Sequence, residues 1–143
     1  MIIYLADRSM NILAVCTNNL PKGLKFINDK KNECVESGVA TFTVDICYDE
    51  KDVQKAKEYC QSGNYILIPD DRGEFGFYTI IEASNDRKDR FINLYAEDGG
   101  LDLLNEVVDT YEATETQSIE FYIQQFAYDS GFEIGRNAVS NLR

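Results

Sequence analysis

The chain has 143 residues, of which 44% are hydrophobic and 27% charged, and its net charge is −11. This composition is that of a globular protein, and the length suits one domain or two small lobes. The strong negative charge argues against binding to nucleic acid or to anionic membranes. The sequence contains no histidine, which excludes the commonest general base and metal ligand at neutral pH.

The four cysteines are widely spaced and form no CxxC pair; they are Cys16, Cys34, Cys47 and Cys60. A zinc site needs closer pairs of ligands, and a disulfide framework is unusual in a chain of this size without a secretion signal. We therefore expect buried free thiols. Residues 1–7 lack the pattern of a signal peptide, and no apolar run is long enough to span a membrane, so neither is expected.

In the first third of the chain, residues 2–6 and 12–17 are apolar runs on either side of a polar turn, which predicts a β-hairpin. Residues 28–33 are strongly charged and are expected to form the tip of a loop between later strand segments. Those segments are expected to include Leu24, Phe26 and Cys34.

Residues 39–46 alternate between apolar and polar side chains, which predicts a strand with one buried face. The expected buried residues are Ala40, Phe42, Val44 and Ile46. Asp49 is a suitable cap for a helix over residues 50–60, and Gly63 is suited to the turn that follows it.

Three further strands are expected at residues 65–68, 75–83 and 90–96, the last two joined by a polar turn at 84–89. The 17 Tyr and Phe residues (nine and eight) lie mostly in such alternating runs and there is no Trp, which favours β-structure.

Toward the C-terminus, Leu101, Leu104 and Val108 repeat at helical spacing. A last helix is expected over residues 118–128, with Ser118 as its cap, and residues 132–135 are typical of the start of another strand. The chain is therefore expected to be the N-terminal part of a longer protein.

These elements together predict an α+β fold, an antiparallel β-sheet or small barrel with an inserted helix and two C-terminal helices. The expected division is a β-rich, barrel-like lobe at 1–97, with the helix near 50–60, followed by a helical segment at 98–143 that leads into a further lobe.

Several groups of acidic residues are candidates for functional sites. The group at the start of the first helix could hold a hard cation, but capping and favourable charge at a helix N-terminus explain it better, since the EF-hand spacing is absent. Its members are Asp45, Asp49, Glu50 and Asp52. The group at residues 70–74 is interpreted as a solvated turn. Scattered turn carboxylates could form a glycosidase pair, although the sequence cannot place any two at the required separation. These are Asp7, Asp86, Asp89, Glu97 and Asp98.

Other patterns point to structure rather than chemistry. Residues 97–100 lack the GxxxxGK pattern of a phosphate loop, and their acids would repel phosphate. The aromatic residues Phe75, Phe77 and Tyr78 are interpreted as core and cross-strand packing. A Cys–His nucleophile is impossible without histidine. We therefore expect no enzyme, and assign no catalytic, cofactor-binding or metal-binding residue.

Three stretches together resemble the N-terminal region of tail-tip proteins from phages of Gram-positive bacteria. They are residues 2–13 (IIYLADRSMNIL), residues 76–104 with their segments GFYTIIEA, INLYAED and LDLL, and residues 131–135 (GFEIG). This family is called phage minor structural protein, prophage endopeptidase tail protein or tail-associated lysin. Its N-terminal region is similar in fold to the hub of contractile-tail baseplates.

The resemblance implies a structural hub, expected to be a trimer, that caps the tail tube in the virion and connects it to host-facing parts. The implied partners are the distal tail protein and the tape measure protein. In this family a peptidoglycan-cleaving or receptor-facing part often follows, but nothing in this sequence matches one. Two alternatives stay open: a peptidoglycan-degrading enzyme fragment, and a monomeric adaptor of a phage-derived secretion apparatus.

Overall fold

The computed structural model describes residues 1–20, 23–34, 36, 38–69, 73–86, 88, 90–105 and 118–127. The chain divides into two compact units, residues 1–100 and residues 101–143. The first unit contains all seven strands found among the described residues.

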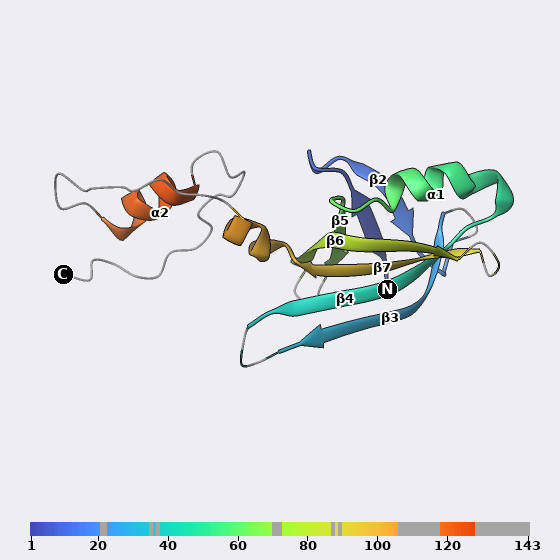
Figure 1. The fold of residues 1–143 in the computed structure, drawn as a ribbon, viewed down its shortest axis with the longest axis horizontal. Coiled ribbons are helices and arrows are strands. Elements are labelled where there is room, and N and C mark those ends of the chain that lie inside the picture. The colour runs from blue at the N-terminus through green and yellow to red at the C-terminus, as the bar shows by residue number, and fades with distance from the viewer. Residues whose placement is uncertain are drawn as a thin grey trace. The chain divides into compact units, whose positions relative to one another are not determined.

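The first unit is built on one antiparallel sheet whose strand order is β2-β1-β5-β6-β7-β4-β3, so that β2 and β3 are its edges (Figure 1). The strands are β1 (Ile3–Ala6), β2 (Ile12–Cys16), β3 (Lys25–Glu33), β4 (Ala40–Cys47), β5 (Tyr65–Pro69), β6 (Phe75–Asp86) and β7 (Phe91–Asp98). The sheet curls into a half-barrel, because Cys16 at the end of β2 forms a parallel bridge with Leu24 just before β3. The two edges therefore approach each other at one end.

The hydrophobic core fills the inner face of the curled sheet. Its largest fully buried side chains come from five strands: Ile3, Leu5, Val44, Ile46, Ile66, Ile80 and Leu94, joined by Cys16 from β2. Burial of each such aliphatic side chain contributes about 1.5–3 kcal/mol relative to exposure. The alternation predicted for β4 is confirmed at Phe42, Val44 and Ile46, which are all buried, whereas Ala40 is only half-buried.

The inserted helix is shorter than predicted. A 3-10 turn, η1 (Glu50–Asp52), precedes α1 (Val53–Tyr59), and Asp49 makes no side-chain capping hydrogen bond. The capping role predicted for Asp49 is therefore wrong. Ala56 and Cys60 are buried in the core, with Val53 and Tyr59 packed against them, so packing of the apolar stripe holds this short helix in place.

The prediction of a charged loop tip at residues 28–33 is wrong, because these residues belong to β3, which pairs with β4 along its length. The pairing register shifts between Ile27 and Lys30, and Asn28 has a φ of 54°. This bulge interrupts the two-residue period, which hides the strand in the sequence. In a similar way, β6 extends to Asp86 through three residues that were expected to form a turn.

At the C-terminal side the sequence predicts two α-helices, whereas the described residues form one 3-10 helix and one α-helix. The first region forms a 3-10 helix, η2 (Gly99–Asn105), in which the Asp98 carboxylate accepts a hydrogen bond from the Gly100 amide (2.8 Å). This local bond favours the tighter turn. The α2 helix (Ile119–Ala127) lies within the second predicted range, and the Ser118 hydroxyl accepts the amide of Phe121 (3.2 Å) as a cap. The strand predicted at 132–135 lies outside the described residues.

In coarse terms the first unit is an antiparallel half-barrel with one short inserted helix, and the α+β prediction fits in part.

Candidate functional site

An open groove lies on the inner side of edge strand β3, where the half-barrel is not closed. It consists of two adjoining hollows of about 260 and 390 Å³ that share Lys31, Gly76 and Tyr78. The first is also lined by Met1, Asp29, Phe42, Ile68 and Pro69. The second is also lined by Glu33, Cys34, Gly38, Ala40, Phe77 and Asp98. The N-terminal residue and strands that are far apart in the sequence, among them β3 and β6, therefore meet at this groove.

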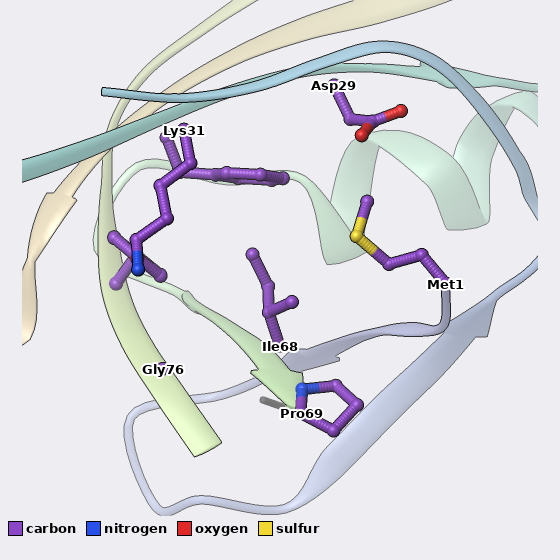
Figure 2. Close-up of a pocket in the computed structure, with 8 residues that line it drawn as sticks. Met1, Asp29, Lys31, Ile68, Pro69 and Gly76 are labelled. Atoms are coloured by element: carbon purple, nitrogen blue, oxygen red, sulfur yellow. The ribbon is translucent and has the colours of Figure 1, made fainter. Parts of the chain in front are cut away.

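The floor of the groove is aromatic and rigidly packed. The rings of Phe42 and Tyr78 lie with centroids 5.6 Å apart, and both residues are buried. A Cβ on Gly76 would lie 3.2 Å from the Tyr78 ring, so a larger residue at this position would crowd the ring. Figure 2 shows Ile68 between Lys31 on one side and Met1 on the other, with Pro69 at the end of β5. The apolar surface that an incoming side chain could contact therefore comes from exposed Met1 and from half-buried Ile68 and Pro69.

The rim of the groove is charged because of the register of β3 on β4. Lys31 pairs with Phe42, and Glu33 pairs with Ala40, so their side chains emerge on the inner face. Lys31 Nζ and Glu33 Oε1 form a salt bridge of 2.5 Å. Both side chains are more than half exposed, so the pair adds little stability. The hydrogen bond that Lys31 donates to Glu33 is the main reason that the pKa of Lys31 is raised.

The site has an acidic balance. Asp29, Glu33 and Asp98 line the two hollows, and Lys31 is the one basic side chain among the described residues that line them. Because Glu33 already binds the Lys31 ammonium, the remaining charge on the rim is negative. The rim therefore attracts basic rather than acidic groups.

Sequence reasoning did not identify this site. Lys31 and Glu33 were assigned to a charged loop tip, and nothing in the sequence links them to Tyr78, which lies on β6. The one available signal is the spacing of Asp29, Lys31 and Glu33 at intervals of two residues, which is typical of one face of a strand.

The acidic group predicted around the first helix is not brought together as a cation site. Asp45 is buried and accepts hydrogen bonds from the side-chain amides of Asn28 (2.7 Å) and Asn93 (2.6 Å). Glu50 instead pairs with Arg90 (2.6 Å). Within the part of the chain that the structure describes, no group of three or more Cys, Asp or Glu residues is arranged to hold a metal ion.

The scattered turn carboxylates are used locally. Asp7 accepts the amides of Ser9 (2.8 Å) and Asn11 (2.9 Å), Asp86 accepts the amide of Lys88 (2.9 Å), and Glu97 accepts the Tyr95 hydroxyl (2.8 Å). Asp89 and residues 70–72 lie outside the described residues. These bonds explain the carboxylates by turn geometry and strand packing.

The predicted aromatic packing differs among its three members. Tyr78 is buried as expected, whereas Phe75 is 56% exposed and contacts the ring of Tyr4 edge-on at 5.8 Å. Phe77 is half-buried against Tyr65, with ring centroids 4.6 Å apart. Phe75 therefore takes part in cross-strand contacts on the outer surface rather than in the core.

The cysteine expectation holds for two of the four thiols. Cys16 and Cys60 are buried, Cys47 is half-buried and Cys34 is exposed, and none of the four forms a disulfide bond. Burial raises the pKa of Cys16 to about 12 and also raises that of Cys60. The two buried thiols are therefore poor nucleophiles, since the thiolate is the reactive form.

Comparison of the sequence with protein-family models finds no match, and comparison with curated proteins finds none. Across the described ranges, the structure contains no helix that is both long enough and apolar enough to cross a membrane.

Proposed function

We propose that this chain is a structural component of a phage or prophage tail tip, where it forms the hub that caps the tail tube. The observation that carries the proposal is the open half-barrel, whose edges β2 and β3 meet only near Cys16 and Leu24 among the described residues. An open antiparallel sheet presents backbone groups for pairing with other chains. The sequence stretches that resemble tail-tip proteins supply the setting.

In this proposal the chain works by association rather than by catalysis, and it forms a homotrimer in the virion. Rings arise from heterologous contacts when the rotation between copies closes. Apolar side chains available for such contacts lie along the β2 edge: Met10 and Ile12 are each 51% exposed, and Leu20 is 56% exposed. The distal tail protein and the tape measure protein are the proposed neighbours along the tail.

A peptidoglycan-degrading enzyme is the alternative that most needs testing, because the groove carries carboxylates. We expect the purified chain to release no muropeptides from peptidoglycan, since Glu33 is bound to Lys31 and an acid–base pair requires two carboxylates held on either side of the bond to be cleaved. Chromatography of the soluble products checks this. Release of muropeptides that is lost in both Asp29→Asn and Glu33→Gln would replace the structural proposal with a hydrolase.

A further inference from the structure

We propose that the outer edge of β3 and the groove beside it bind an extended, basic segment of a partner protein, which adds to the sheet as a strand. The inference rests on the proposed function in one respect, namely that the chain acts by binding other proteins. It adds which surface is used and what chemistry the partner segment has.

The first step concerns the backbone of β3. This strand is the last in the sheet and pairs with β4 on one side. At Phe26 the outward backbone groups are already satisfied: Asn18 donates to the Phe26 carbonyl (2.8 Å) and accepts the Phe26 amide (3.1 Å). Beyond this point, the segment 29–33 is exposed. In an antiparallel ladder alternate residues direct N–H and C=O away from the partner strand, so this segment offers a short pairing edge.

The second step concerns the space next to that edge. The first hollow lies between β3 and the residues Ile68, Pro69 and Gly76 of β5 and β6 (Figure 2). The second is lined by β3 and by Gly76, Phe77 and Tyr78 of β6, among others. Side chains of an added strand alternate between the two faces of the sheet, so every second one would enter the hollows. Their volumes of about 260 and 390 Å³ accommodate aliphatic side chains, and Met1, Ile68 and Pro69 supply apolar surface in the first. Strand addition with side-chain pockets is a known mode of peptide recognition.

The charge of the groove rim determines which kind of partner segment can bind there. Among its described residues, the rim carries the carboxylates of Asp29, Glu33 and Asp98 and one basic side chain, Lys31, and the whole chain has a net charge of −11. A basic segment gains from this field, whereas the β3 rim of a second copy would bring its own carboxylates against these and is disfavoured at this edge. The inward-pointing charges of Lys31 and Glu33 also disfavour edge-to-edge pairing of identical β3 strands. A heterologous basic strand is therefore the occupant that the surface fits.

The test uses the full chain, labelled with ¹⁵N, and three capped eight-residue peptides as probes. The first alternates lysine and valine, the second alternates glutamate and valine, and the third is the lysine–valine peptide with its backbone methylated at alternate nitrogens. We expect the lysine–valine peptide to shift the amide resonances of segment 29–33. The glutamate peptide and the N-methylated peptide should each bind at least tenfold more weakly, because one lacks the charge and the other cannot donate ladder hydrogen bonds.

Equal binding of the methylated and unmethylated lysine peptides would reduce the effect to general charge attraction and overturn the proposal. So would shifts confined to β2 or α1, or the absence of binding by the lysine–valine peptide.

A charge-reversal pair locates the interaction independently. The double variant Asp29→Lys/Glu33→Lys should weaken binding of the lysine–valine peptide at least tenfold. The matched control Glu58→Lys/Glu82→Lys makes the same change of net charge at two exposed positions outside the groove and should bind as the wild type does. Comparable losses in both would contradict the proposal. The solution mass of the same samples reports separately on the hub: a trimer that ignores the peptides defeats only the strand-addition inference, and a monomer that binds them at β3 defeats only the trimeric hub.

Discussion

The side chain of Asn18 takes the place of a neighbouring strand for Phe26, since its amide nitrogen donates to the Phe26 carbonyl at 2.8 Å and its oxygen accepts the Phe26 amide at 3.1 Å. Next to it, the Lys25 ammonium donates to the carbonyls of Thr17 (3.0 Å) and Leu20. These contacts close the half-barrel at one end. The groove marks the end that stays open.

Loss of the Asn18 side chain should destabilise the fold. In Asn18→Ala the backbone groups of the buried Phe26 lose both partners, which costs about 1–3 kcal/mol in the free energy of unfolding. Urea denaturation followed by circular dichroism measures this. Asn19→Ala is the matched control, because Asn19 is exposed and its bond to Thr17 is made by the backbone amide. A loss of equal size in both variants would show that Asn18 has no special role.

The buried Asp45 should tolerate neither a change of charge nor a change of hydrogen-bonding character. In Asp45→Asn an amide group must face Asn28 or Asn93, both of which now donate to the carboxylate. We expect a loss of about 1–3 kcal/mol in unfolding free energy and altered amide resonances at the β3 bulge. Asp49→Asn should change stability little, since Asp49 makes no capping bond. If Asp45→Asn left the free energy of unfolding unchanged, the view that this carboxylate fixes the bulge would be refuted.

The four thiols should react with iodoacetamide at rates that follow their exposure to solvent. Iodoacetamide at pH 8 should label exposed Cys34 first and half-buried Cys47 more slowly. Cys16 and Cys60 should react only in denaturant, because burial raises their pKa and blocks access. Peptide mass spectrometry after timed quenching identifies the sites. Rapid labelling of Cys16 in the native chain would contradict the burial of this thiol.

The same burial predicts an alkaline loss of stability. Since the folded-state pKa of Cys16 is raised from the ordinary 9.0 to about 12, the folded chain retains a proton that the unfolded chain releases. The contribution of the protonated Cys16 thiol to the free energy of unfolding is complete below pH 9.0 and is lost as the pH rises toward about 12. The decline in unfolding free energy across this window should be shallower in Cys16→Ala than in the wild type. Parallel declines would show that the thiol is not the cause.

The turn between β1 and β2 offers a pH test in the acidic range. Hydrogen bonds from the Asn11 side chain and backbone, followed by that from Ser9, lower the pKa of Asp7 below 3.8. This contribution to stability is present above pH 3.8 and is lost as the pH falls through the lowered value. In Asn11→Ala the pKa of Asp7 should rise toward 3.8 without reaching it, because the backbone bond remains. NMR titration of the Asp7 carboxyl carbon measures the shift, and an unchanged pKa would count against the side-chain bond.

The parts of the fold that could be predicted from the sequence are those with an uninterrupted period. In β4, Phe42, Val44 and Ile46 alternate with polar residues, and all three are buried. The β1–β2 hairpin was predictable from two short apolar runs on either side of a polar turn, in which Asp7 lies. In these segments local pattern and tertiary burial agree.

The candidate site could not be predicted, because it depends on contacts between residues far apart in the chain. Lys31 on β3 and Tyr78 on β6 line both hollows, although they lie far apart in the sequence. Lys31 and Glu33 follow a bulge and carry charges, so that their segment has the composition of a loop although it forms an edge strand. Composition cannot distinguish these cases, since edge strands also carry charges as protection against pairing.

The proposed hub is tested most directly by the solution mass of the chain, measured by light scattering after size exclusion over a range of concentrations. We predict a stable particle of three times the 16.3 kDa chain mass. A particle of 16.3 kDa at every concentration would contradict the trimeric hub and favour a monomeric adaptor.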